Sequence, residues 1–169
     1  MDGTLYIDNF IDNDMFLFNT LIDTTDWDRR MSSRMTTSFG VSYNYSDMAY
    51  PDVLIPSYLD DLISRITDTV GFTPNNCLVN YYLDGRSRMG YHSDRTDILL
   101  PGTGVVIVSL GSTRILRFRN ISDRSIVDFT LRSGSLFYMT AGVQDLWVHS
   151  IPSDDTDNGR ISLTFRNII

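Results

Sequence analysis

The stretch CLVNYYLDGRSRMGYHSD, from Cys77 to Asp94, marks the point at which the chain changes character. It opens with a run of apolar, β-branched and aromatic residues and then reaches turn residues, a pattern that predicts a β-strand followed by a turn. It ends with His92 two positions before Asp94. On an extended strand, side chains at this spacing point to the same side. The stretch therefore predicts the start of a β-rich region that carries two candidate ligating side chains.

Six further runs after this stretch share its composition and are bounded by Gly, Asn, Asp or Ser. They are GVVIVSLG (104–111), TRILRFRN (113–120), SIVDFTLR (125–132), GSLFYMT (134–140), DLWVHSI (145–151) and RISLTFRNI (160–168). Short strands at this spacing are typical of a β-sandwich or a jelly roll.

The part before Cys77 has a mixed pattern. TLYIDNF (4–10) predicts a short strand, and Asp12 or Asp14 is placed to cap a helix through MFLFNTLID (15–23). A second helix is predicted in PSYLDDLISRITDTVG (56–71), with Pro56 in its first turn and Gly71 at its end. Its apolar residues fall on one stripe, namely Leu59, Leu62, Ile63, Ile66 and Val70.

Length and composition indicate one globular domain. The chain has 169 residues, of which 42% are hydrophobic, and no apolar run is long enough to cross a membrane. The first residues are acidic and lack the basic flank and apolar core of a signal peptide. Cys77 is the one cysteine, so no disulfide forms within the chain. We expect a soluble intracellular monomer.

The charges are distributed unevenly. All 14 basic residues are Arg, all 21 acidic residues are Asp, and the net charge is −7. Residues 1–28 carry seven Asp and no Arg, whereas residues 86–132 carry eight Arg and four Asp. The net charge argues against a nucleic-acid partner, but the basic region weakens that argument. This region is either a solvated sheet face or a phosphate-binding rim.

A third ligand is available in His149, the second of the two histidines, which lies in the strand-like run LWVHSIP. Two histidines and one carboxylate make up the facial triad of non-heme Fe(II) oxygenases. Arg160 and Arg166 follow, six residues apart, so both face the same side of a regular strand. Guanidinium groups bind carboxylates bidentately, and 2-oxoglutarate has two carboxylates.

Taken together, these blocks resemble the AlkB-like Fe(II)/2-oxoglutarate dioxygenases. The opening stretch looks like the family's Asn-x-Tyr strand, turn and His-x-Asp, and VVIVSLGSTRILRFR (105–119) is similar to its core strand pair. SGSLFYMT, WVHSIP and GRISLTFRNI follow in the family's order. SRMTTSFGVSYNYS (33–46) resembles part of the family's nucleotide-recognition lid.

The resemblance implies an α+β fold in a single dioxygenase domain, residues 1–169. A double-stranded β-helix, or jelly roll, would form the catalytic core from residue 77 to 169. Residues 1–76 would supply N-terminal helices and a short substrate lid that cover this core. The implied reaction uses Fe(II), 2-oxoglutarate and O₂ to demethylate or hydroxylate alkylated bases of DNA or RNA.

The resemblance also implies roles for individual residues. His92, Asp94 and His149 would ligate Fe(II). Five residues would hold 2-oxoglutarate: Arg160 and Tyr82 at its distal carboxylate with Ser162 nearby, and Arg166 and Asn80 at its metal-chelating end.

Substrate contacts are implied for Arg34, Tyr45, Arg95 and Thr96, the last two in the loop after the iron ligands, and Arg114 is a further candidate. Tyr45 would stack on the flipped base or make a plain hydrophobic contact. Arg34 would contact phosphate or be solvated. Arg114 would bond turn carbonyls or contact substrate.

The loop after the iron ligands departs from the family. Thr96 stands where repair members have an acidic residue that reads the damaged base, and Arg95 would repel a cationic base if it pointed inward. Asp97 would serve instead if the loop were shifted by one residue. An alternative substrate is therefore a nucleoside, a small molecule or a protein side chain. A non-catalytic jelly-roll binding module is a third reading, which the complete set of ligands and arginines disfavours.

Overall fold

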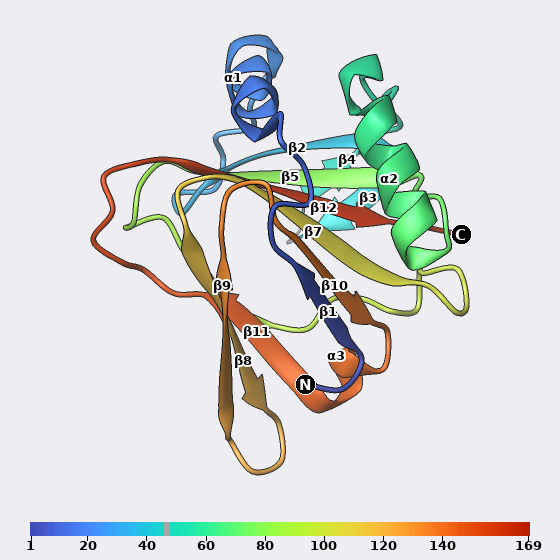
Figure 1. The fold of residues 1–169 in the computed structure, drawn as a ribbon, viewed down its shortest axis with the longest axis vertical. Coiled ribbons are helices and arrows are strands. Elements are labelled where there is room, and N and C mark those ends of the chain that lie inside the picture. The colour runs from blue at the N-terminus through green and yellow to red at the C-terminus, as the bar shows by residue number, and fades with distance from the viewer. Residues whose placement is uncertain (46–47) are drawn as a thin grey trace.

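The computed structural model of the chain describes residues 1–45 and 48–169, without the side chain of Tyr45. Strands dominate these residues (Figure 1). The strands are β1 (Thr4–Ile7), β2 (Met35–Gly40), β3 (Tyr43–Tyr45), β4 (Met48–Tyr50), β5 (Asn76–Tyr82), β6 (Met89–His92), β7 (Gly104–Gly111), β8 (Arg114–Asn120), β9 (Ile126–Leu131), β10 (Leu136–Thr140), β11 (Trp147–Ile151) and β12 (Arg160–Arg166). The helices are α1 (Asp14–Thr24), a 3₁₀ turn (Ser57–Leu59), α2 (Asp60–Val70) and α3 (Val143–Leu146). Within the described part of the chain, no helix has the length and apolar character of a membrane span.

The larger sheet has six antiparallel strands in the order β1-β10-β7-β12-β5-β2. Each strand predicted after Cys77 is present, and so is the strand predicted in TLYIDNF. Two of the six strands, β1 and β2, come from the part of the chain before residue 77. The division into an N-terminal cover and a C-terminal core therefore applies to the helices but not to the sheet.

The smaller sheet has four antiparallel strands in the order β6-β11-β8-β9. A buried apolar cluster joins the inner face of this sheet to the larger sheet. The smaller sheet contributes Leu116 and Phe118 of β8, and the larger sheet contributes Ile107 of β7 and Phe137 of β10. A second cluster fills the space between the other face of the larger sheet and helices α1 and α2, which lie across it in Figure 1. The molecule thus has an apolar layer on each side of its larger sheet.

The helices follow the predicted pattern with two corrections at their starts. Asn13, not Asp12 or Asp14, is the N-cap of α1, and its side chain makes no capping hydrogen bond. Pro56 precedes the 3₁₀ turn, so it does not lie in the first turn of α2. Gly71 ends α2 as predicted, with a φ of 81° that favours glycine. The apolar stripe of this helix packs against the larger sheet.

The segment that resembles a lid divides into two parts. Its first part is β2, an edge strand of the larger sheet that pairs with β5 from Met35↔Tyr81 to Gly40↔Asn76. This part therefore belongs to the larger sheet. Its second part enters the separate two-stranded ladder of β3 and β4.

Candidate metal and cosubstrate site

Strand alternation builds one wall of a pocket between the two sheets. On β12, the side chains that line the pocket are Arg160, Ser162, Thr164 and Arg166. The intervening apolar residues of the strand pack on the helix side of the sheet. Neighbouring β5 is in register with β12, so that Asn80 lies opposite Ser162 and Tyr82 lies opposite Arg160. Because both strands alternate in step, their polar residues collect on one face.

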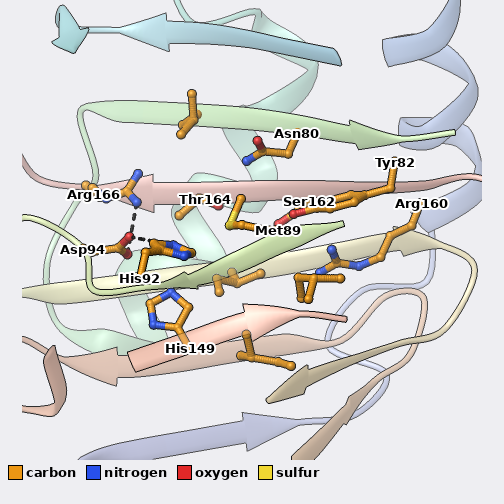
Figure 2. Close-up of a pocket in the computed structure, with 14 residues that line it drawn as sticks. Asn80, Tyr82, Met89, His92, Asp94, His149, Arg160, Ser162, Thr164 and Arg166 are labelled. Atoms are coloured by element: carbon orange, nitrogen blue, oxygen red, sulfur yellow. Dashed lines mark hydrogen bonds and ion pairs between the residues drawn. The ribbon is translucent and has the colours of Figure 1, made fainter. Parts of the chain in front are cut away.

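The opposite wall carries the two histidines. His92 on β6 and His149 on β11 are direct cross-strand partners, and their ring centroids are 4.4 Å apart. Asp94 follows the end of β6 and turns toward them (Figure 2). The candidate ligand atoms of all three residues lie within 4.8 Å of one another. The chain thus brings together two imidazoles and a carboxylate that are up to 57 residues apart.

The surroundings of both imidazoles are compatible with metal ligation. The Nδ1 atom of His92 lies 2.8 Å from the carbonyl oxygen of Gly90. A carbonyl oxygen only accepts, so Nδ1 donates to it, and Nε2 is the ring atom that lies near the Asp94 carboxylate. Burial lowers the pKa of His149 to about 4, an effect that the nearby Asp94 partly opposes.

Asp94 is held in place by contacts on both its carboxylate and its backbone. Arg166 donates a hydrogen bond of 3.1 Å from Nη2 to Oδ2, and the other carboxylate oxygen lies 3.7 Å from Nε2 of His92. The backbone N–H of Asp94 donates to the side-chain oxygen of Gln144 at 2.8 Å. Burial opposes ionisation of Asp94, but Arg166, with His149 and His92, holds the pKa of its carboxyl below the usual range. Oδ1 is therefore the oxygen that faces the histidines.

Arg160 closes the other end of the pocket. Its side chain is 1% exposed, Nη2 donates to Ser109 Oγ at 2.9 Å, and its guanidinium lies 5.2 Å from the ring centre of Tyr82. Among the described residues, its Nε and Nη1 atoms have no hydrogen-bond partner. Burial lowers the pKa of Arg160 to about 10, so the group remains a cation at neutral pH. A buried cation with two unused donors fits a carboxylate ligand.

The family model of the 2OG-Fe(II) oxygenase superfamily matches residues 12–166 of the chain. The chain belongs to this superfamily. Its members use Fe(II), 2-oxoglutarate and O₂, and both ends of the pocket fit this set. The His–Asp–His cluster has the donors of the facial iron triad, and Arg160 lies where an anionic cosubstrate needs a cation.

Similar proteins place this oxygenase in the AlkB-like branch. The DNA oxidative demethylase ALKBH2 of Mus musculus is 32% identical over 140 residues, which cover 77% of this chain and 58% of that protein. The alkB homolog 3 dioxygenase of Rattus norvegicus is 27% identical over 174 residues, covering 90% and 59%. An uncharacterized mimivirus protein, R406, is 29% identical over 141 residues, covering 82% and 73%. The chain thus spans between about half and three quarters of the length of these relatives.

Structural similarity supports the fold of this branch. The structure of OsALKBH1 aligns with a TM-score of 0.72 over 99% of both chains, at 18% sequence identity. At this identity the match shows a shared fold, which is mostly antiparallel β-sheet with few helices.

The oxygenase buries Arg34, for which the sequence left phosphate contact or solvation open. Arg34 is 7% exposed, so it is not solvated, and its Nε donates to Asn80 Oδ1 at 2.8 Å. Its Nη1 also contacts Ser33 Oγ at 3.0 Å and the carbonyl of Arg88 at 3.3 Å. Because Asn80 Oδ1 accepts from Arg34, the amide presents its NH₂ end to a ligand in the pocket.

The remaining predicted contacts lie outside the pocket. The Arg95 guanidinium pairs with Asp97 at 2.6 Å, and both side chains are more than half exposed. Neither Arg95 nor Thr96 is among the residues that line the pocket. Arg114 is buried and donates to the carbonyls of Ser87 and Pro152, which supports its structural interpretation. The side chain of Tyr45 lies outside the described residues.

Two site residues were missed by sequence reasoning. Ser109 bonds Arg160, and Gln144 orients the backbone of Asp94. A weak indication for Ser109 exists in the sequence, since it is a lone hydroxyl in the apolar run VVIVSLG. Gln144 lies in the short α3 and carries no comparable indication.

Proposed function

We propose that the protein is an oxidative demethylase or hydroxylase that acts on alkylated bases of nucleic acid. One observation carries this proposal: a cluster of two imidazoles and a carboxylate lies at one end of a pocket, and at its other end is a buried arginine whose Nε and Nη1 have no hydrogen-bond partner among the described residues. The named activity of the ALKBH2 relatives, DNA oxidative demethylation, supports a nucleic-acid substrate.

The proposal assigns two sets of residues. His92, Asp94 and His149 hold Fe(II). The residues for 2-oxoglutarate are Arg160, Tyr82 and Ser162 at the distal carboxylate, and Arg166 and Asn80 at the chelating end. Arg166 has a second task in this assignment, because it already fixes one oxygen of Asp94.

Bound Fe(II) supplies the oxidation chemistry, in which 2-oxoglutarate and O₂ give succinate and CO₂ while one oxygen atom enters a substrate C–H bond. The hydroxylated N-methyl group then leaves as formaldehyde. The residues of the chain bind and orient the reactants. Arg160 neutralises the distal carboxylate, while Arg166 leaves the Asp94 oxygen nearer to His92 for the metal. Leu116, Ile107 and Ile151 exclude water from the pocket.

The entrance of the site bears on the choice of base. Because Asp97 holds the Arg95 guanidinium in solvent, the repulsion expected between Arg95 and a cationic base is removed. Thr96 supplies no charge of its own. We assign stacking on the flipped base to Tyr45, at the end of β3, since an aromatic ring there would stabilise a cationic base.

We further infer that residues 1–169 form one catalytic domain with a double-stranded β-helix at its centre. Two antiparallel sheets with a pocket between them support this interpretation. In this arrangement α1 and α2 cover the larger sheet, and the β3–β4 ladder is the substrate lid.

The test is incubation with Fe(II), 2-oxoglutarate and a panel of N-methylated and unmodified DNA and RNA oligonucleotides. Mass spectrometry follows each base and the released succinate, with His92→Ala as the inactive control. Loss of a methyl group from one base together with matching succinate is the expected result.

Two other outcomes contradict the proposal to different degrees. Succinate release without change in any oligonucleotide would replace the substrate by a nucleoside, a small molecule or a protein side chain. If neither succinate release nor a change in any oligonucleotide is seen, and the protein does not bind Fe(II), the protein would be a non-catalytic binding module.

A further inference from the structure

An open groove lies beside the pocket, on the other side of two shared side chains. Met89 and Ile151 line both the pocket and the groove. The rest of the groove comes from Arg88 and β6, from the end of β11 and the residues after it, from one position on β8, and from two positions before β2. The pocket and the groove are therefore adjacent.

The groove is cationic in a chain that is acidic as a whole. Arg34, Arg88 and Arg117 line it, and none of the 21 Asp residues is among its described lining residues. Arg88 is exposed, and no described carboxylate lies within 4.0 Å of it. The groove is therefore a local site for anions on a molecule with a net charge of −7.

The ion pair of Arg117 lies at the rim of the groove and is exposed to solvent. Arg117 donates to both carboxylate oxygens of Asp128, at 2.8 and 2.7 Å, and both side chains are more than one third exposed. A phosphate in the groove would compete with this carboxylate for the guanidinium, whereas Arg88 is open to it without competition from a described carboxylate. Three serines, Ser33, Ser150 and Ser153, add hydroxyl donors along the same groove.

An aromatic side chain stands between the arginines. Tyr91 precedes His92 on β6, so the two side chains lie on opposite faces of the strand. The tyrosine is 38% exposed, and the guanidinium carbon of Arg119 lies 3.9 Å from its ring centre. Arginines combined with an exposed aromatic ring are typical of surfaces that bind single-stranded nucleic acid.

We propose that this groove binds the backbone of a single-stranded nucleic acid next to the nucleotide held in the pocket. The inference rests on the proposed function and adds to it the strand state of the substrate and the surface that holds it. A single strand suits the groove because a duplex brings a second phosphate backbone, which needs basic contacts of its own.

The test is fluorescence anisotropy with a labelled oligonucleotide of about 12 nucleotides, long enough to fill a typical single-strand site. Mn(II) replaces Fe(II), so that binding is measured without turnover. The double variant Arg88→Gln/Arg117→Gln is compared with Arg65→Gln, which removes an exposed charge on α2 outside the groove. Melting temperatures of all variants establish that they are folded.

The double variant should bind the single strand about tenfold more weakly. The slope of log affinity against log salt concentration should become less steep by about 0.7 for each phosphate contact that is lost. The control should bind like the unaltered protein, and a duplex of the same sequence should bind more weakly than the single strand. Equal affinities of the double variant and the control for the single strand would contradict binding in the groove. Equal affinities of the unaltered protein for duplex and single strand would contradict the preference for a single strand.

Failure of the groove is distinguishable from failure of the proposed function. Arginine-dependent binding without oxidation of any methylated oligonucleotide would retain the groove and reject the function. Oxidation with binding that is insensitive to the double variant would retain the function and reject the groove.

Discussion

The two ends of strand β12 carry the same side chain in opposite states. Arg166 is 2% exposed and pairs with Asp94, which is itself buried. Arg160 is 1% exposed, and the described residues place no carboxylate within 4.0 Å of it. Its neighbours are the hydroxyl of Ser109 and the ring of Tyr82. One end of the strand is therefore neutralised within the chain, whereas the other has no acidic partner among the described residues.

The two arginines therefore differ in whether their charge is balanced in the ligand-free protein. At the Arg166 end, the ion pair is part of the folded protein and fixes the carboxylate that faces the histidines. At the Arg160 end, Ser109 and Tyr82 are the neighbours of the buried cation, and the cosubstrate carboxylate assigned to this end in the proposed function would offset the remaining cost of its burial. Variants at the two ends should consequently differ in the property that they change.

The largest effect is expected at the metal cluster. His149→Ala removes a central ligand, so turnover measured as succinate release should fall by more than about 100-fold, beyond the range of outer-shell changes. Because His149 is a buried neutral group, the variant should remain folded. Turnover close to that of the unaltered protein would show that the cluster does not hold the catalytic metal.

Arg166→Met should destabilise the ligand-free protein by about 3 kcal/mol, because Asp94 is left buried without its cation. The measurement is urea unfolding without metal or cosubstrate. An unchanged free energy of unfolding would mean that the ion pair is not needed to hold Asp94, and the contrast between the two ends of β12 would be lost.

Arg160→Met should have the opposite profile. The ligand-free protein should be as stable as before or more stable, since a buried cation is replaced by an apolar side chain of similar length. The KM for 2-oxoglutarate should rise by about 30-fold or more, the usual scale for truncating one partner of a buried charge pair. A loss of stability equal to that of Arg166→Met, or an unchanged KM, would contradict this profile.

A smaller effect is expected at Gln144. Gln144→Leu removes the acceptor for the backbone N–H of Asp94, and Fe(II) affinity should fall by about tenfold. Titration of the metal in the absence of O₂ measures this change. An equal loss in Gln144→Glu, which keeps an acceptor oxygen, would show that the hydrogen bond is not the cause.

The smallest effect is expected at Cys77, which lies on the face of β5 that points away from the pocket. Burial raises the pKa of its thiol well above the usual range, so the reactive thiolate is scarce at neutral pH. Alkylation by iodoacetamide should be slow in the folded protein and should become rapid in urea. Rapid modification of the native protein would mean that this face of β5 opens readily.

Strand alternation explains how much of the site could be predicted from the sequence. Arg160 and Arg166 are separated by an even spacing, which places both on one side of β12 whatever its neighbours are. His92 and Asp94 were found by the same rule, although Asp94 lies just beyond the end of β6. Ser109 and Gln144 could not be found in this way, because their roles depend on which strand or helix lies beside them. The same limit applies to Arg34, whose partner Asn80 is 46 residues away.

The fold was predictable to a similar extent. Periodicity identified the strands after Cys77 and the stripe of α2, because each pattern is local. The place of β2 in the larger sheet could not be predicted, since it is decided by pairing with β5, which a local pattern does not contain.

Calorimetric titration of 2-oxoglutarate tests the two-ended site most directly. The unaltered protein is titrated with and without Mn(II), and Arg160→Met is titrated with Mn(II). Tight binding should require both the metal and Arg160. Binding of equal affinity without metal, or to Arg160→Met, would contradict a site in which the His–Asp–His cluster and Arg160 hold opposite ends of one cosubstrate.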